Sequence, residues 1–171
     1  RDGISPTAFP SGISGVPSEM IESLSPVLIH RREYRRDSGG PGRFRGGLGQ
    51  TLTVGVRSDK PYMFSPIFDR TKFAAQGYQG GKPGALASIE ASNGVVFDTK
   101  GMREFPPGTV LELNLPGGVY EPFSRDPEAV RQDVIDGLVS VQAAREEYGV
   151  VIDPDSQEID DEATFELRAL G

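Results

Sequence analysis

A stretch rich in glycine and arginine is the part of this sequence best suited to chemistry. Four arginines and several glycines fall within RRDSGGPGRFRGGLGQ, residues 35–50. Consecutive glycines allow backbone N–H groups to turn toward one point, and such concavities favour anions. Arg45 adds a planar fork of donors suited to phosphate or carboxylate. The candidate anion- or substrate-binding residues are Ser38, Gly39, Gly40, Gly42, Arg45, Gly46 and Gly47.

Two other interpretations of this stretch stay open. The stretch lacks the Gly-Lys-Ser/Thr ending of a P-loop and the third glycine of a dinucleotide-binding loop. Its glycines could simply form tight turns before a strand, with the arginines solvated or paired to Asp37 and Glu33. Six arginines between residues 31 and 45 also resemble a basic patch for nucleic acid. We expect no nucleic-acid partner, because GRFRGG occurs once and the chain carries a net charge of −7.

Other residues with catalytic potential form no complete set. His30 is the only histidine, and its position after an apolar run favours a buried or interface hydrogen bond over metal ligation. Asp126, Glu128, Asp133 and Asp136 are expected at helix N-terminal or exposed positions, where carboxylates complement the helix dipole. The later acidic residues lack EF-hand spacing, and no HExxH or Ser-His-Asp pattern is present. The catalytic residues stay unknown, and no metal site is predicted.

Composition narrows the class of protein. The chain has 171 residues, enough for one domain and a tail. It has no cysteine, which excludes thiol chemistry and favours the cytoplasm. It has no apolar run of the length that a membrane helix needs, so we expect no membrane partner. Because it starts at an arginine and opens with no signal-peptide pattern, we expect a fragment of a longer protein. Residues 1–85 carry a net charge of +5 and residues 86–171 a net charge of −12.

The first two thirds of the chain predict an antiparallel sheet. Residues 1–26 are rich in proline and glycine and predict an extended N-terminal arm with one short turn at 18–24. Residues 27–124 predict a β-rich core containing the Gly/Arg loop. Alternation at 51–58 is typical of a half-buried strand, Leu111, Leu113 and Leu115 share a face, and Asn93-Gly94 predicts a hairpin turn. Further strands are expected at 27–34, 62–68, 85–92, 95–99 and 109–115.

The last third predicts helices, so the fold class is α+β. Residues 125–153 are expected to form a helix pair and a short strand at 150–152. Asp126 and Ser140 are the predicted N-caps, and Gly149 the left-handed residue that ends the second helix. Residues 154–171 form an acidic tail or a short last helix.

Three blocks of the sequence resemble the hydantoinase B/oxoprolinase family. They are FPSGISGVPSEMIESLSPVLIHRREYRRDSGGPGRFRGGLGQ, GYQGGKPGA and PGGVYEPFSRDPEAVRQDVIDGLVSVQAAREEYGVVID. The resemblance covers residues 5–153 and places the chain in the C-terminal portion of the family. That family includes B subunits of ATP-dependent N-methylhydantoinases, the matching half of 5-oxoprolinase and a related subunit of acetone and acetophenone carboxylases.

The resemblance implies a hetero-oligomeric, ATP-dependent hydrolase. A hydantoinase-A-type ATP-binding subunit would phosphorylate a small cyclic amide, and the B subunit would complete its hydrolysis. ATP and a divalent metal are implied for the full complex, with no cofactor in this chain, since metal ligands lie in the N-terminal part of the B subunit. The chain would need that remainder of the B subunit and be inactive alone. The alternatives are a non-catalytic assembly domain or part of a related ketone carboxylase.

The glycine-arginine stretch matches the family motif, whereas another part of this sequence differs from the family pattern. Gly80, Gly81 and Gly84 match a second glycine turn of the family. In PGGVYEP, Val119 and Glu121 replace glycines that family members carry. Two Cβ atoms restrict that backbone and Glu121 adds a negative charge, so a pocket lined by this turn would differ from that of the hydrolases.

Overall fold

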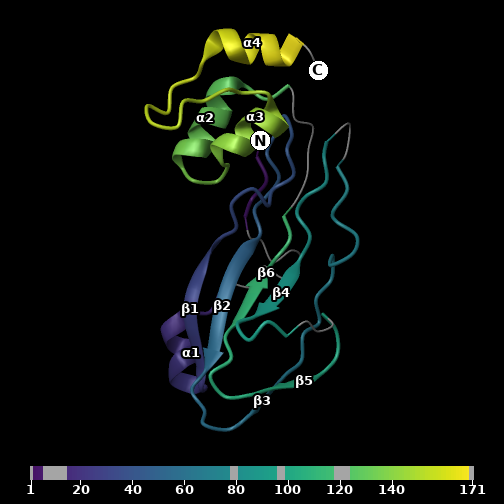
Figure 1. Cartoon of the computed structure of the whole chain (residues 1–171), viewed down its shortest axis with the longest axis vertical. Coiled ribbons are helices and arrows are strands. Elements are labelled where there is room, and N and C mark those ends of the chain that lie inside the picture. Colours follow the sequence, from purple (N-terminus) through teal and green to yellow (C-terminus); the bar gives the residue numbers. More distant parts are fainter. Residues whose placement is uncertain (1, 6–14, 78–80, 96–98, 118–123, 170–171) are drawn as a thin grey trace.

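The molecule is elongated, with a β-sheet at one end and helices α2, α3 and α4 at the other (Figure 1). The computed structural model describes residues 2–5, 15–77, 81–95, 99–117 and 124–169. Loop segments connect the two ends (Figure 1). The predicted α+β class is confirmed, while the division into four sequence segments stays a prediction.

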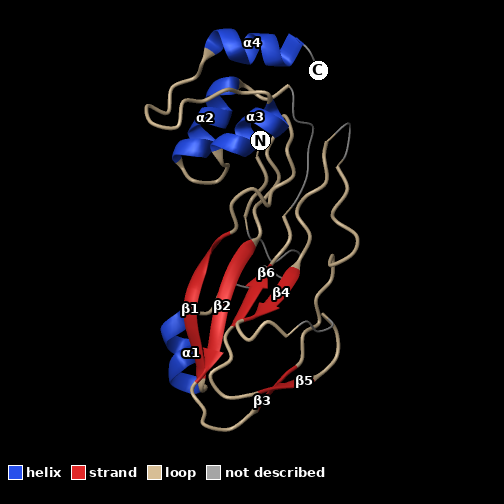
Figure 2. Cartoon of the chain, in the orientation of Figure 1, coloured by secondary structure: helices blue, strands red, loops and turns tan. Residues whose placement is uncertain are grey.

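The sheet at one end has four antiparallel strands. In spatial order they are β1 (Val27–Tyr34), β2 (Gln50–Val56), β6 (Leu111–Asn114) and β4 (Ser88–Ala91) (Figure 2). The register between β1 and β2 shifts between Ile29 and Arg31, which makes His30 an extra residue in β1. His30 is exposed, and its imidazole lies so close to Gly55 that a Cβ there would approach Nε2 to 2.8 Å. Of the two positions expected for His30, burial within this chain is wrong, and a position at an interface stays a prediction.

A two-stranded ribbon completes the first core. β3 (Tyr62–Phe64) pairs with β5 (Arg103–Phe105), and the Phe105 ring stacks on Tyr62 with centroids 5.9 Å apart. Phe105, Leu111 and Leu113 are buried together, which confirms the predicted shared face for Leu111 and Leu113. Leu115, the third leucine of that prediction, follows the end of β6 and is not part of this cluster. β5 was not predicted, because its sequence REF shows no hydrophobic alternation.

The outer face of this ribbon carries exposed apolar side chains. The register continues from the Tyr62–Phe105 pair to a bridge between Ile67 and Lys100, so residues 63, 65 and 67 share the face turned away from the core. Met63, Ile67 and Met102 are between 55% and 83% exposed. Clustered exposed apolar side chains are typical of protein interfaces.

At the predicted Asn93-Gly94 hairpin, the structure describes the turn and only part of the second strand. Gly94 adopts a left-handed φ of 71°, as a turn glycine does, and its N–H donates to the carbonyl of Ala91 at 2.9 Å. β4 pairs antiparallel with β6. Residues 96–98 of the expected strand lie outside the described residues.

The expected turn at 18–24 is a short helix. α1 (Ser18–Leu24) lies beside β1 (Figure 1). The Glu22 carboxylate accepts the N–H of Ile29 at 2.8 Å, and the Glu22 carbonyl accepts a hydrogen bond from Arg57 Nη2. These contacts fix α1 to the first two strands. Residues 6–14 of the predicted arm lie outside the described residues.

The helical end begins with the predicted helix pair. In α2 (Pro127–Ile135) the Asp126 carboxylate accepts the N–H of Glu128 at 3.1 Å. In α3 (Val141–Tyr148) the Ser140 hydroxyl accepts the N–H of Ala143 at 3.0 Å, and Gly149 ends the helix with φ 63°. Both predicted caps and the predicted stop are confirmed. A second core packs beneath the helices, formed by Val130, Val134, Val139, Ala144, Tyr148, Val150 and Ile152.

The acidic C-terminal segment forms a docked helix, the second of the two predicted forms. α4 (Asp161–Ala169) buries Thr164, whose hydroxyl accepts the N–H of Val151 at 3.0 Å. Arg168 Nη2 donates to the carbonyls of Arg125 and Tyr148. The predicted strand at 150–152 is reduced to a single bridge between Ile152 and Ile159.

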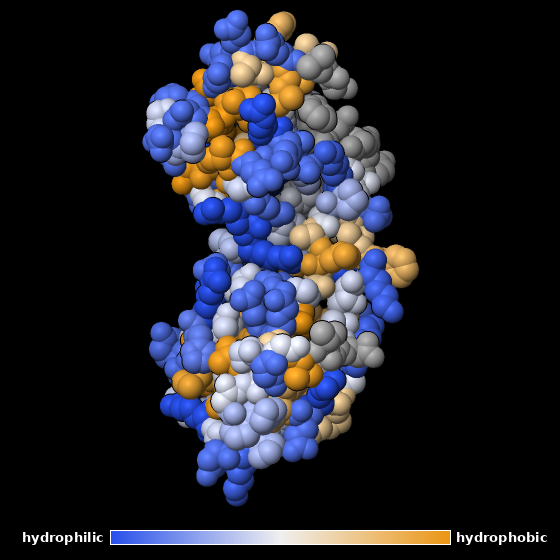
Figure 3. Space-filling model, in the orientation of Figure 1, coloured by the Kyte–Doolittle hydropathy of each residue, from blue (hydrophilic) through white to orange (hydrophobic). Residues whose placement is uncertain are grey.

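The visible surface is mostly hydrophilic, with smaller hydrophobic areas at the helical end and at mid-height (Figure 3). Among the described helices, none has the length and hydropathy that crossing a membrane requires.

Candidate functional site

The glycine-arginine loop joins β1 to β2 and reaches the helical end of the molecule (Figure 1). Ser38, Gly39, Gly40, Gly42, Arg45 and Gly46 are buried, and Gly47 is half-buried. The loop is therefore an internal part of the fold.

The glycines of this loop serve close packing. None of the loop glycines has a positive φ. A Cβ on Gly39 would overlap the carbonyl oxygen of Gly46, and a Cβ on Gly47 would lie 2.6 Å from the carbonyl oxygen of Ile4. Another on Gly49 would overlap the carbonyl oxygen of Leu115. Glycine is required because neighbouring backbones leave no room for a side chain.

Several polar backbone groups of the loop are already hydrogen-bonded within the chain. The N–H of Gly46 donates to the carbonyl of Gly40 at 3.1 Å, and the N–H of Gly49 to the Ser38 hydroxyl at 2.9 Å. The N–H of Arg45 donates to the Asp2 carboxylate at 2.8 Å. The anion that contacts this loop is therefore the Asp2 carboxylate, a side chain of the protein itself.

Arg45 belongs to a buried cluster of alternating charges. Its Nε lies 3.2 Å from one carboxylate oxygen of Asp133, and Arg125 Nη2 lies 2.7 Å from the other. Arg125 also pairs with Asp2 at 2.6 Å. Arg45, Arg125 and Asp133 are all buried, so the expected exposed position of Asp133 is wrong. The cluster ties the loop and the N-terminal segment to α2.

Asp2 titrates below its usual range because of this cluster. Burial by itself raises the pKa of the Asp2 carboxyl, but the hydrogen bonds and charges of Arg125 and Arg45 outweigh burial and lower the pKa. Asp2 is therefore ionised at neutral pH, and two carboxylates balance the two guanidinium groups of the cluster.

The other arginines near the loop have separate partners. Arg31 pairs with Glu33, as one interpretation of the sequence proposed, whereas Asp37 accepts the N–H of Ser140 at 2.7 Å. Arg36 Nε donates to the carbonyl of Gly137 at 3.0 Å. A groove beside β1 mixes three arginines with three carboxylates, from Arg31, Arg35, Arg36, Glu33, Glu112 and Asp136. Interleaved carboxylates disfavour a polyanion, so nucleic-acid binding gains no support here.

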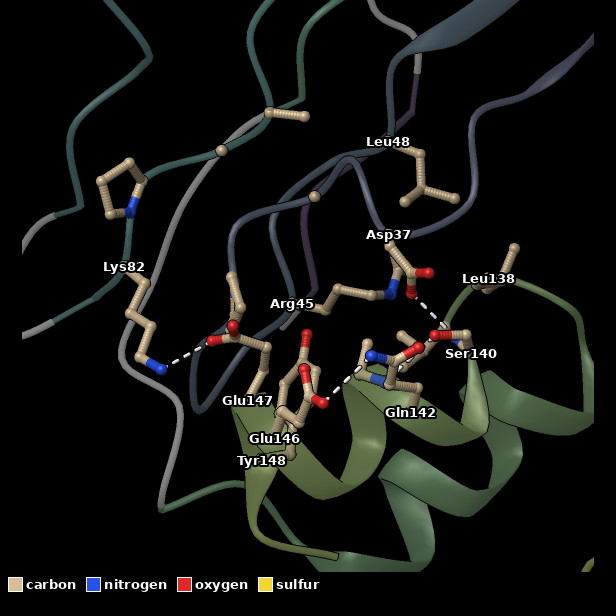
Figure 4. A pocket seen from close by; sticks show the side chains of 17 residues that line it. Asp37, Arg45, Leu48, Lys82, Leu138, Ser140, Gln142, Glu146, Glu147 and Tyr148 are labelled. Carbon is tan, nitrogen blue, oxygen red and sulfur yellow. Dashed lines mark hydrogen bonds and ion pairs between the residues drawn. The ribbon is translucent and has the colours of Figure 1, made fainter. Parts of the chain in front are cut away.

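A pocket of about 490 Å³ lies where the loop meets the helices (Figure 4). Its walls come from residues 37–48, from residues 82–85 and from residues 138–148. These segments lie in three different blocks that carried the family resemblance. Of the predicted site residues, Gly39 and Arg45 line the pocket. The other five, Ser38, Gly40, Gly42, Gly46 and Gly47, are not among its lining residues.

Polar side chains line one part of the pocket. Lys82 Nζ lies 2.6 Å from the Glu147 carboxylate, and Gln142 donates to Glu146 at 3.0 Å (Figure 4). The Tyr148 ring points from α3 toward the Arg45 side chain (Figure 4). Burial raises the pKa of the Tyr148 hydroxyl well above its usual value, more than the charges of Arg125 and Arg45 lower it. The hydroxyl is a neutral donor at physiological pH.

The sequence missed most of the pocket-lining side chains. Lys82 lies inside the second glycine block, but nothing local to that block indicates its partner Glu147. Tyr148 is the last residue of α3, and no local pattern in the sequence indicates that its side chain lines a pocket. Among the described residues, no group of three or more histidine, cysteine, aspartate or glutamate side chains is placed to hold a metal ion. Gly80, Val119 and Glu121 lie outside the described residues.

Comparison with known proteins identifies the family. A family model described as hydantoinase B/oxoprolinase matches residues 1–119. The chain is 37% identical over 162 residues to a protein assigned as the B subunit of a D-/L-hydantoinase from Pseudomonas sp. strain NS671, covering 90% of this chain and 27% of that protein.

Two solved structures share the fold. The ATP-dependent caprolactamase of Pseudomonas jessenii has a TM-score of 0.76 at 32% identity, covering 92% of this chain and 28% of that chain. The nucleotide-free acetone carboxylase has a TM-score of 0.74 at 24% identity, covering 99% of this chain and 28% of that chain. The chain thus spans less than a third of each relative. It belongs to the hydantoinase B/oxoprolinase family.

Proposed function

We propose that this chain is part of a hydantoinase-B-type subunit of an ATP-dependent enzyme that hydrolyses cyclic amides. The observation that carries the proposal is the likeness to ATP-dependent caprolactamase, at 32% identity over 92% of the chain. The relative assigned as a hydantoinase B subunit, at 37% identity, supports the same class of ring-opening reaction.

The proposed partners are an ATP-binding subunit of the hydantoinase-A type and the rest of the B-type subunit. In this proposal the partner phosphorylates the amide, and the B-type subunit completes the hydrolysis. ATP and a divalent metal ion are the proposed cofactors of the full complex. The donor set supports metal binding elsewhere, because the chain has one histidine and no cysteine, and its described carboxylates form no ligand cluster.

The chain itself contributes a pocket and surfaces for assembly. The buried charge cluster holds the loop and the helices in fixed positions around the pocket, as binding sites require. The exposed apolar face of the β3–β5 ribbon supports a role in contacts with the rest of the enzyme.

The test is a reconstitution. The full-length subunit that contains this chain is produced with its ATP-binding partner, and ring opening of ε-caprolactam, hydantoin and 5-oxoproline is followed with and without ATP. We expect ATP-dependent hydrolysis by the complex and no turnover by the 171-residue chain alone. Turnover by the chain alone, or a complex that opens no cyclic amide, would contradict the proposal.

The alternatives predict different outcomes of the same experiment. A ketone carboxylase would consume bicarbonate and a ketone while leaving cyclic amides intact; the likeness to acetone carboxylase supports only the fold at 24% identity. A pure assembly domain would tolerate Arg45→Ala without loss of turnover, provided that the complex still forms.

A further inference from the structure

A groove with excess positive charge lies where the β3–β5 ribbon ends. This basic groove has a volume of about 450 Å³ and is lined by residues 68–73, 99 and 100. Its carboxylate, from Asp69, pairs with Lys100 at 3.0 Å. Within the part of the chain that the structure describes, the side chains of Arg70 and Lys72 have no ion-pair or hydrogen-bond partner. The groove therefore offers two cations to an acidic group.

Exposed apolar side chains accompany these cations. Phe73 lines the groove and Ile67 bridges to Lys100, and each is 83% exposed. Arg70 has a left-handed φ of 58°, which is uncommon for a residue with a side chain, and its carbonyl accepts the N–H of Ala87 at 3.0 Å. The turn that presents the cations is thus held by the fold, and an apolar group can be buried beside them.

Helix α4 presents a surface of the opposite charge. Asp161, Glu162 and Glu166 are exposed around Phe165, whose side chain is 76% exposed. These four residues recur at the spacing of one side of a helix, called here the acidic face, while Thr164 is buried on the other side. No described residue forms an ion pair with any of the three carboxylates. An aromatic ring flanked by unpaired carboxylates matches the chemistry of the basic groove.

Charge decides how two copies of the chain can meet. Two basic grooves placed together would bring Arg70 and Lys72 against the same cations, and two acidic faces would bring carboxylates together, and both arrangements cost free energy. The acidic face against the basic groove pairs opposite charges and buries Phe165. Because α4 and the β3–β5 ribbon lie at opposite ends of the molecule, this contact requires two copies (Figure 1).

We propose that the acidic face of α4 docks into the basic groove of a second copy of this chain. Its carboxylates meet Arg70 and Lys72, and Phe165 packs against Phe73, as when a helix lays an apolar side chain into a groove. Two elongated copies in antiparallel alignment can form the contact twice, which closes the pair. One such contact is small, so we expect its dissociation constant to be on the order of 100 μM. The inference is independent of the proposed function.

Sedimentation equilibrium of the 171-residue chain tests the contact. We expect the weight-average mass to rise from 18.4 kDa toward twice that value between about 10 μM and about 1 mM protein. Association should weaken between about 0.05 M and about 0.5 M NaCl, because salt screens exposed charges. A mass that stays at 18.4 kDa would overturn the inference and leave both surfaces to a different partner. Association that salt leaves unchanged would overturn it as well.

Single substitutions locate the two surfaces. Lys72→Glu in the groove and Glu162→Lys on α4 each replace an attraction by a repulsion, and each is expected to weaken association by about tenfold or more. Glu90→Lys is the matched control, because it changes the net charge as Glu162→Lys does, and Glu90 is exposed on β4 and belongs to neither surface. Equal effects of Glu162→Lys and Glu90→Lys would contradict the proposal.

A mixture of two defective variants gives the sharpest test. Lys72→Glu keeps the acidic face, and Phe165→Ala keeps the basic groove, so a mixed pair contains one intact contact. We expect each variant alone to stay monomeric and the equimolar mixture to contain dimers. A mixture that stays monomeric would rule out docking of α4 into the groove. Circular dichroism checks the fold of each variant, and Glu162→Lys takes the place of Phe165→Ala if the latter fails to fold.

Discussion

Arg45 is a buried cation, and only part of its guanidinium is hydrogen-bonded within the chain. One edge of its guanidinium pairs with Asp133, and its backbone N–H is bound by Asp2. Buried ion pairs repay their desolvation cost only when further hydrogen bonds satisfy the remaining groups. Here Arg125 bridges both carboxylates, so the group is held in one geometry. The cluster therefore serves the pocket mainly by fixing the position of the Arg45 side chain, and less by adding net electrostatic stabilisation.

Removing Arg45 should therefore be costly for the fold. In Arg45→Ala the Asp133 carboxylate keeps only one of its two arginine partners, and we expect the free energy of unfolding to fall by about 3 kcal/mol or more. Arg131→Ala is the control, because Arg131 pairs with Glu128 and Glu158 on the surface and should cost less than about 1 kcal/mol. Urea denaturation of both variants measures the difference, and equal losses would contradict the importance of burial.

The loop between β1 and β2 is built by backbone packing. Its glycines lie where adjacent segments of backbone come closer than any side chain allows, as at Gly39 against Gly46. The loop connects two cores, one under the sheet and one under the helices. Its shape is thus set by contacts between segments distant in sequence.

A single added methyl group should test this packing. In Gly39→Ala the new Cβ would overlap a backbone carbonyl that cannot move freely, and we expect a loss of about 1–3 kcal/mol in the free energy of unfolding. Gly15→Ala is the matched control, since its Cβ would meet only the flexible end of Arg32. Thermal and urea unfolding of the pair give the comparison. Equal stability would show that the loop relaxes around the methyl group.

Local elements could be predicted from the sequence, and long-range pairings could not. The caps at Asp126 and Ser140 and the stop at Gly149 depend on neighbours within a few residues, and the structure confirms them. Asp133 looked like an exposed helical carboxylate because its partner Arg45 lies 88 positions away. The pocket escaped prediction for the same reason: no local pattern states which three segments meet.

At the scale of the whole molecule, the charge cluster couples two cores that do not share buried side chains. Val130 and Val134 belong to the helical core, and Leu111 and Leu113 to the sheet core. The cluster links α2 to the loop that continues into β2. This linkage is buried, and the contacts of Asp37 with Ser140 and of Arg36 with Gly137 join the same two ends of the molecule.

Hydrogen exchange can measure that coupling. In Asp133→Asn the charge that holds both arginines is removed with little change in shape. We expect the amides of Val130 and Val134 to exchange faster, while those of Leu113 and Val54 in the sheet keep their protection. Asp136→Asn, at the exposed C-cap of α2, is the control. Uniform loss of protection across both cores would indicate a single cooperative unit.

The crowded glycine loop has a consequence for how such pockets diversify. At Gly39, which lines the pocket, an added carbon would collide with the carbonyl oxygen of Gly46, so this part of the loop wall cannot accept a side chain. The opposite wall, on α3, presents side chains that can be exchanged on a regular helix. Relatives that bind ligands of different size should therefore differ in the α3 side chains that line the pocket, while their glycine loops stay alike.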